Sequence, residues 1–297
     1  MIICLIIGKL FKIILLMFII KMIFHHIFFS FTSTKNSLTP EQSSIIESHI
    51  SSHCGKMEYK FWNLDSAKTF MKINYPEFFN IFNEMLEKPI VLCDFFRYVL
   101  MYHFGGIYTD LDFLIIRPFE QFLKMLEAKQ IAYYPNTIKN PTIILSEEWL
   151  DSCNLSNTIH NGILISMNKL HPFWLKLIHE IYQDIMVKKT IISTEQDVYN
   201  TTGPKKLLEY YKRNSSQFAD VCILPYYYFC PFISHVKEND QLVTKLYNNA
   251  VIPDESVHTP SKESWSFFNI NEYNNLPKLC PNSFFVNVFL NMGSMWK

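Results

Sequence analysis

Residues 102–120, YHFGGIYTDLDFLIIRPFE, contain the feature that most limits how this chain can fold. Two glycines, which readily end a helix, are followed by a short apolar run, two aspartates one residue apart and a second apolar run. This order predicts a strand, a turn at Asp110 and Asp112, and a second strand. Because a carboxylate loses free energy wherever water is scarce, two of them beside buried strands indicate a bound cation or ligand.

The segments around this motif alternate between strand and helix patterns. Short apolar or aromatic runs predict strands at residues 58–62, 131–136 and 161–167. Helical spacing is found at residues 66–86, with a break near Pro76, at 91–104, which end at the double glycine, and at 171–186. Strands separated by helices predict an α/β sandwich.

Composition excludes some classes of function. The 297 residues are 49% hydrophobic, which is ample for a core, and the net charge is zero without a basic tract. A nucleic-acid partner is therefore not indicated. The seven cysteines show no CxxC or CxxH spacing, so a zinc site is not indicated either. Cys222 and Cys230 are the nearest candidates for a disulfide in an oxidising compartment.

The N-terminal residues 1–20 are apolar apart from Lys9 and Lys12. Their length falls between the apolar core of a signal peptide and a full membrane span, and no small-residue cleavage site follows. We expect an uncleaved signal anchor, with residues 21–297 as one catalytic domain in the lumen of the Golgi or the ER, in a single-pass type II arrangement. A cleaved signal peptide and an interfacial helix are the alternatives.

The segment CDFFRYVLMYHFGGIYTDLD, residues 93–112, resembles the sugar-binding signature of glycosyltransferase family 32. That signature reads roughly A-D-x-x-R-Y-x-x-L-x-x-x-G-G-I-Y-x-D-x-D. The family includes inositol-phosphoceramide mannosyltransferases and initiating α-1,6-mannosyltransferases. Further segments resemble other parts of the family: KMIFHHIFFS (21–30), NGILISMNKLHPFW (161–174), TTGPKKLL (201–208) and ILPYYYFCP (223–231).

The resemblance implies a GT-A fold, a nucleotide-sugar-binding α/β/α sandwich with a Rossmann-like mixed sheet. It also implies a nucleotide-sugar donor and a divalent cation, usually Mn²⁺ and otherwise Mg²⁺. Asp112 would bind the cation directly, and Asp110 would reach the ribose or, through water, the cation. Asp94 and Arg97 would contact the hydroxyls of the donor sugar, and Arg97 also the phosphates.

Further residues enter the expected site through the same resemblance. The donor pocket would include Tyr108, Gly105, Gly106 and Asn161, with Asn161 in either the donor or the acceptor part. His258, ahead of Ser264 and Trp265, would be a third contact to the metal or the diphosphate, although its spacing is about one residue longer than in the family. Phe28 would stack on the nucleotide base, or pack in the core.

Plainer readings of these residues stay open. Asp110 and Asp112 suit a turn cap or a structural calcium site, and Asp94 with Arg97 suits an ordinary surface pair at i,i+3 spacing. Four histidines suit structural roles: His25 and His26 in a buried strand, His160, and His171 at a helix start beside Pro172.

The function expected from the resemblance is a metal-dependent, retaining transfer of a hexose at a membrane. The first choice is mannose from GDP-mannose, passed to a glycolipid such as inositol phosphoceramide or to a glycan. An α-galactosyl- or N-acetylglucosaminyltransferase with a UDP-sugar is the nearest alternative. A catalytically inactive sugar-binding relative and a metal-using hydrolase or phosphotransferase are the alternatives from other classes.

Overall fold

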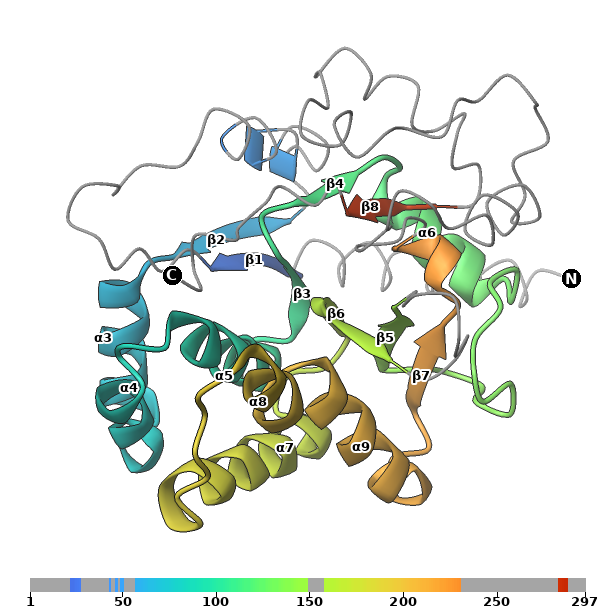
Figure 1. Cartoon of the computed structure of the whole chain (residues 1–297). Coiled ribbons are helices and arrows are strands. Elements are labelled where there is room, and N and C mark those ends of the chain that lie inside the picture. Colours follow the sequence, from blue (N-terminus) through green and yellow to red (C-terminus); the bar gives the residue numbers. More distant parts are fainter. Residues whose placement is uncertain are drawn as a thin grey trace, which may run out of the picture.

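The computed structural model describes residues 22–27, 43, 46–47, 49–50, 57–148, 158–230 and 283–287. At its centre lies a six-stranded sheet (Figure 1). Its strands are β1 (Ile23–Ile27), β2 (Glu58–Trp62), β3 (Gly106–Thr109), β5 (Ile143–Glu147), β6 (Ile159–Ser166) and β7 (Val221–Leu224). The spatial order is β2-β1-β3-β6-β5-β7. Strand β6 runs antiparallel to both of its neighbours, and all other pairs are parallel, so the sheet is mixed.

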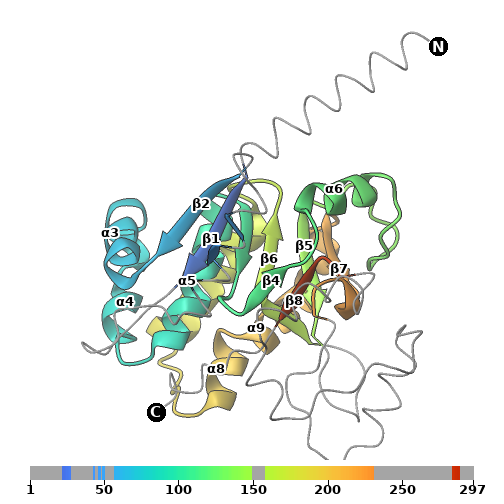
Figure 2. The same ribbon diagram turned by 90° about the horizontal axis from the view of Figure 1, so that it is seen from above.

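Helices cover one face of this sheet, and a smaller layer covers the other (Figures 1 and 2). The helices are α3 (Leu64–Asn74), α4 (Asn80–Glu84), α5 (Pro89–His103), α7 (Pro172–Tyr182), α8 (Glu195–Thr201) and α9 (Pro204–Asn214). The smaller layer consists of α6 (Phe119–Glu127) and a two-stranded sheet of β4 (Phe113–Ile115) and β8 (Phe285–Asn287). Four short turns complete the described elements: η1 (Pro76–Phe78), the π-helical η2 (Gln183–Val187), η3 (Ser215–Gln217) and η4 (Tyr226–Tyr228).

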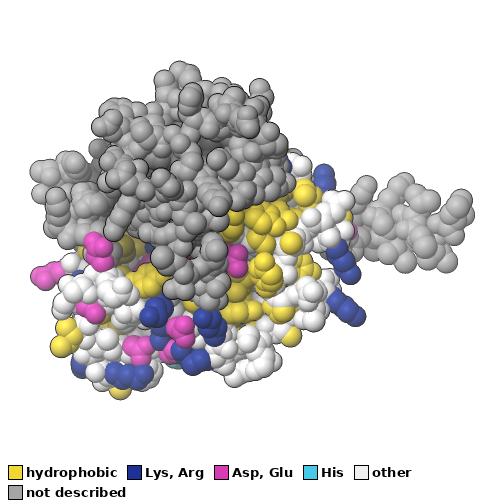
Figure 3. All heavy atoms as spheres, turned by 45° about the vertical axis from the view of Figure 1, so that its right-hand side comes forward, with side chains coloured by type: hydrophobic (Ala, Val, Ile, Leu, Met, Phe, Trp, Pro, Cys, Tyr) yellow, Lys and Arg dark blue, Asp and Glu magenta, His cyan; other side chains and the backbone are white. Residues whose placement is uncertain are grey.

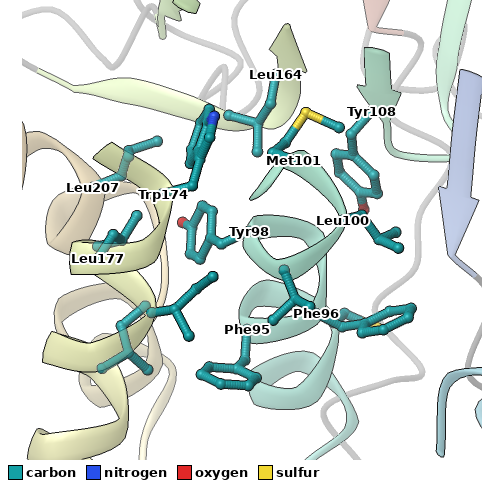
Figure 4. Packing of buried hydrophobic residues seen from close by; sticks show 14 of the residues in the cluster. Phe95, Phe96, Tyr98, Leu100, Met101, Tyr108, Leu164, Trp174, Leu177 and Leu207 are labelled. Atoms are coloured by element: carbon teal, nitrogen blue, oxygen red, sulfur yellow. The ribbon is translucent and has the colours of Figure 1, made fainter. Parts of the chain in front are cut away.

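Helix α5 is the centre of the larger hydrophobic cluster, between the sheet and α7. Every residue from Val91 to Met101 is buried, as expected for a helix that is apolar all round. Figure 4 shows Tyr98 of α5 beside Trp174 of α7, and the ring of Tyr98 stacks on that indole at 6.0 Å. This packing holds the two charged residues of α5, Asp94 and Arg97, in fixed positions.

Apolar and charged side chains occupy separate areas on one side of the surface (Figure 3). On the side where α6 and β7 lie, hydrophobic side chains gather over a broad area, and acidic and basic side chains gather below it (Figure 3). Among the described residues, several large apolar side chains are exposed, including Ile73, Tyr134 and Ile191.

The predicted α/β class is confirmed, and so are most of the predicted elements. The strand at 58–62 is β2, and the helix at 91–104 is α5. The helical pattern of 66–86 divides at Pro76 into α3, η1 and α4. The capping box of Asn63 and Ser66, with hydrogen bonds in both directions, begins α3 and is the local reason for its position.

The strand predicted at 131–136 is wrong. Within the described chain, Tyr134 forms an isolated antiparallel bridge with Ile223, and no strand develops around it. Pro135 follows and has no N–H with which to extend the pairing. The strand that pairs with β7 along its length is β5. The suggested disulfide is contradicted as well, because Cys222 and Cys230 are both free, buried thiols.

The predicted membrane anchor, residues 1–20, lies outside the described residues. Among the helices that are described, none combines the length and the apolar character that crossing a bilayer requires. The anchor therefore stays a prediction.

Gly105 and Gly106 have a packing role at the start of β3. Both have positive φ angles, +64° and +88°, at the start of β3, whereas Asp110 follows the other end of that strand. A Cβ on Gly106 would lie 2.1 Å from the carbonyl oxygen of Ile23 in β1. The close approach is thus between backbones within the sheet. The expected place of the two glycines beside the donor stays a prediction.

Candidate active site

The candidate site lies at the edge of the sheet where β3 and β5 end and the antiparallel β6 begins. Asp110 directly follows β3, and its backbone N–H donates to the carbonyl oxygen of Gly162 in β6 at 2.8 Å. A Cβ at Gly162 would lie 2.5 Å from Asp110 Oδ2, so a glycine is needed there to leave room for the carboxylate. In open α/β sheets, ligands bind at the carboxyl ends of parallel strands, often where the strand direction or order changes.

Asp94 is the centre of a buried hydrogen-bond network below this edge. The residue is 4% exposed, and both of its side-chain oxygens have partners. Oδ1 accepts from the Asn161 side-chain amide at 2.9 Å, and Oδ2 accepts from the Thr202 hydroxyl at 2.9 Å. Burial raises the pKa of Asp94, and the nearby Arg97 charge opposes that rise. The network joins α5, β6 and the end of α8.

Arg97 connects that network to the edge of the sheet. Its guanidinium lies 3.1 Å from Asp94 Oδ1 and 3.4 Å from Asp110 Oδ1. It also donates to the backbone carbonyl of Asn161 at 2.8 Å and lies over the ring of Tyr108 at 4.8 Å. Arg97 is 5% exposed, so it is a fixed positive charge directly beneath Asp110.

Tyr108 holds Asp110 from the same side. Its hydroxyl donates to Asp110 Oδ1, and the residue is only 2% exposed. The ring is therefore packed beneath the site, where Figure 4 shows it beside Leu100 and Met101. Tyr108 therefore supports Asp110, and its expected place beside the sugar or ribose stays a prediction.

Asp112 has the clearest unfilled requirement in the site. Its Oδ1 atom is buried and has no hydrogen-bond partner in the described part of the chain. Burial, and then the like charge of Asp110, raise the pKa of the Asp112 carboxyl to about 8. A buried carboxylate oxygen without a donor is costly unless a cation neutralises it. Oxygen ligands of this kind suit Mg²⁺ or Mn²⁺.

The described side chains supply only part of a cation's coordination shell. Within them, no group of three or more His, Cys, Asp or Glu side chains is arranged to hold a metal. A hard cation such as Mg²⁺ commonly binds through one or two carboxylates, with waters and substrate phosphates completing the shell. Asp110 and Asp112 fit that pattern.

His160 lies beside Asp110. Its Nδ1 accepts a hydrogen bond from the Gly162 N–H at 2.9 Å, which leaves the proton of the neutral ring on Nε2. The ring packs edge-on against Phe113. Burial lowers the pKa of His160 to about 4, so the ring is neutral at pH 7.

The structure brings Asp94, Arg97, Asp110 and Asn161 together through direct contacts. Asp112 lies two positions after Asp110, in the turn directly before β4. The surface-pair alternative for Asp94 and Arg97 is wrong, because both are buried. His258 and Phe28 lie outside the described residues, and their roles stay predictions.

The plainer readings of three other histidines agree with the structure. His25 and His26 are fully buried in β1. Trp62 Nε1 donates to His25 Nδ1, and His25 Nε2 lies 3.2 Å from the Gly105 carbonyl. His171 caps α7 by accepting from the Phe173 N–H.

Thr202 and Gly162 are site residues that the sequence reading did not assign. Thr202 lies 108 positions from Asp94 in the chain, and only the fold brings its hydroxyl to that carboxylate. The likeness of the Thr-Gly-Pro turn was the available signal for it. Gly162 directly follows Asn161, and its requirement becomes visible only with Asp110 in place.

A mixed α/β sheet with carboxylates at the carboxyl end of a strand, and a buried arginine beneath them, is typical of α/β proteins that bind a phosphorylated ligand with a cation. Residues 39–131 match a family model described as "Glycosyltransferase sugar-binding region containing DXD motif". This match agrees with the family resemblance of residues 93–112 in the sequence.

Two curated relatives are mannosyl phosphorylinositol ceramide synthases of Saccharomyces cerevisiae. The chain is 30% identical to one over 146 residues, which is 49% of this chain and 32% of the relative. It is 40% identical to the other over 55 residues, 18% of this chain and 14% of the relative. The chain thus spans a third or less of the length of these relatives. Among solved structures, a chain described as PaToxG Glycosyltransferase matches with 13% identity and a TM-score of 0.47, over 90% of this chain and 89% of the other.

Proposed function

We propose that this protein is a metal-dependent, retaining glycosyltransferase with a GT-A type fold. It transfers a hexose, in the first instance mannose from GDP-mannose, to a glycolipid such as inositol phosphoceramide or to a glycan. The observation that supports this most directly is the buried Asp112 oxygen without a partner, next to an Asp110 that Arg97 and Tyr108 hold in place. The match to the family model and the two yeast relatives support the class of reaction and the choice of mannose.

Asp112 and Asp110 would hold Mn²⁺ or Mg²⁺ at the end of β3. When bound, such a cation neutralises the charge that develops on the departing diphosphate. Arg97 contributes a permanent positive charge beneath the same place, and its contacts with Asp94 and Asp110 fix its position. His160 offers an Nε2 proton on the edge of the site. These groups are preorganised, so they need no rearrangement as charge develops.

Retention of the anomeric configuration is proposed from the family likeness. The corresponding mechanism is attack of the acceptor hydroxyl on the same face as the departing diphosphate. NMR analysis of the product tests this directly, since an inverted anomeric centre would exclude it. The membrane anchor and the lumenal location in the Golgi or ER are proposed from the sequence of residues 1–20 alone.

The function is tested by measuring donor binding to the full chain in detergent, by calorimetry, with Mn²⁺ and with EDTA. GDP-mannose, UDP-galactose, UDP-glucose and UDP-N-acetylglucosamine are titrated in turn. We expect one donor to bind only with metal, and to lose binding in Asp112→Asn but not in Asp65→Asn, an exposed aspartate on α3. Binding of a UDP-sugar in place of GDP-mannose would support the alternative donor. A folded protein that binds none of them would contradict the transferase function.

A further inference from the structure

Glu148 is a second acidic residue at the same edge of the sheet. It directly follows β5, and its backbone N–H donates to the carbonyl of Thr158, just before β6, at 2.8 Å. Strand β6 lies between β3 and β5, so the ends of the strands that carry Asp110 and Glu148 are separated by two strand spacings, about 10 Å. The metal and donor contacts assigned above do not involve Glu148.

One oxygen of the Glu148 carboxyl is buried without a partner. Its Oε2 atom is buried and accepts no hydrogen bond from the described part of the chain. Burial raises the pKa of this carboxyl to about 7. Two neutral groups face it: the Cys230 thiol and the Tyr199 phenol, whose pKa values are raised first by their own burial and also by the Glu148 charge.

The preceding residue, Glu147, is a glutamate whose carboxylate has a hydrogen-bond partner within the fold. Glu147 is half-buried, and its carboxylate accepts a hydrogen bond from the backbone N–H of Tyr226, which lowers a pKa that burial raises. The fold therefore satisfies Glu147 but leaves an oxygen of Glu148 without a donor. A buried acceptor in that state is explained when a ligand supplies the donor.

The Cys230 thiol lies near Glu148 and also near the two aspartates. Besides its burial and Glu148, the charges of Asp112 and Asp110 also raise the pKa of its thiol. One small side chain is thus close enough to feel carboxylates from both ends of the edge. Glu148 and the two aspartates therefore lie around the same thiol, at the ends of strands about 10 Å apart.

We propose that Glu148 positions the acceptor: its unpartnered oxygen accepts a hydrogen bond from a hydroxyl of a cyclic polyol, while Asp110 and Asp112 hold the donor on the other side of the edge. The inference rests on the proposed transferase function and deepens it. The same chemistry is offered by an inositol headgroup and by a sugar, and the test below separates these two sources.

The test compares Glu148→Gln with Glu147→Gln in the full chain in detergent. Three quantities are measured for each variant. They are the affinity for the donor with Mn²⁺, hydrolysis of the donor by water (followed as the nucleoside diphosphate set free), and transfer to either inositol phosphoceramide in mixed micelles or methyl α-mannoside. We expect Glu148→Gln to raise the KM for one acceptor roughly tenfold or more, the effect of losing a hydrogen bond to a charged group. Donor affinity and release to water should stay within about twofold of those of Glu147→Gln.

Three results would overturn the proposal. Equal transfer by the two variants would show that Glu148 does not touch the acceptor, and a loss of donor affinity in Glu148→Gln would place it on the donor. An unaltered chain that binds donor with metal but neither polyol would also contradict it. Failure of the transferase function itself gives a different result. In that case the unaltered chain would show no metal-dependent donor binding, so there would be none for Asp112→Asn to lose.

Discussion

At the scale of single residues, Arg97 joins the buried part of the site to its open edge. A buried ion pair is costly to break, because the remaining partner stays desolvated without its counter-charge. Here the remaining partners would be Asp94, whose oxygens then depend on Asn161 and Thr202, and Asp110. Stability and activity should therefore fall together when Arg97 is changed.

We predict that Arg97→Lys lowers the free energy of unfolding by about 3 kcal/mol. A lysine has one ammonium in place of the guanidinium fork, so it cannot serve both aspartates and the Asn161 carbonyl in this geometry. Chemical denaturation measures the change. Arg213→Lys is the matched control, since Arg213 pairs with Glu180 at the surface, and its replacement should cost about 1 kcal/mol or less. Equal losses for the two variants would contradict the structural role of Arg97.

Glu148 gives a prediction for the dependence of stability on pH. Its carboxyl has a pKa of about 7 in the folded chain against 4.5 ordinarily, so between these values the folded state holds a proton that the unfolded state releases. The stability that Glu148 contributes is fully present below about pH 4.5 and is lost as the pH rises through about 7. The thiol of Cys230 and the phenol of Tyr199 stay neutral across this window.

Glu148→Gln should remove that loss. The variant should show a flatter stability profile between about pH 4.5 and 7, with a difference from the unaltered chain of at most about 3 kcal/mol at the upper end. Urea denaturation at several pH values, in EDTA, measures it. Glu195→Gln, at an exposed position on α8, is the control and should leave the slope unchanged. Asp112, whose pKa is raised to about 8, adds its own slope in both proteins, so a slope in Glu148→Gln as steep as that of the unaltered chain would contradict the role of Glu148.

At the scale of elements, the approach of β3 to β1 depends on Gly106. At φ +88°, with a Cβ that would lie 2.1 Å from a backbone oxygen, an alanine meets both strain and a clash that no side-chain movement relieves. We predict that Gly106→Ala lowers the free energy of unfolding by about 2–4 kcal/mol or prevents folding. Gly203→Ala, at φ −83° with its nearest contact at 3.0 Å, should cost clearly less. Thermal denaturation of both variants measures the two losses of stability.

Elements whose cause is local were predictable from the sequence. Helix α5 has an uninterrupted apolar run that stops at two glycines, and β2 is a short aromatic run, so each is encoded within its own residues. The role of Gly106 was not predictable, because it depends on Ile23, which is more than eighty positions away. The expected strand at 131–136 is reduced to one bridge, because Pro135 has no N–H with which to extend the pairing of Tyr134 with Ile223.

The candidate site divides in the same way. The motif gave Asp94, Arg97, Asp110 and Asp112 because they lie close together along the chain. Thr202 and Glu148 come from distant segments: the packing of α8 on α5 brings Thr202 to Asp94, and the sheet order brings Glu148 to the edge that carries Asp110. The sequence therefore predicted the part of the site that α5 and the turn after β3 form. The remaining residues were found only in the folded structure.

At the scale of the whole molecule, the site joins elements from both layers, so filling it should stabilise the chain as a unit. Arg97 and Asp94 belong to α5, Asn161 to β6, and Asp112 precedes β4 of the opposite layer. A ligand that binds the folded state alone stabilises it by about 2.7 kcal/mol when its free concentration is a hundred times its dissociation constant. Mn²⁺ with the correct nucleotide diphosphate should therefore raise the melting temperature by several degrees.

EDTA should reverse that rise, and Mn²⁺ alone should produce a smaller one, because waters replace the diphosphate in the cation's shell. The rise should be absent in Asp112→Asn, in which the buried oxygen no longer carries a charge, and unchanged in Asp65→Asn. Differential scanning calorimetry of the three proteins measures it. A rise that survives in Asp112→Asn would place the cation elsewhere and would remove the main support for the function assigned to this edge of the sheet.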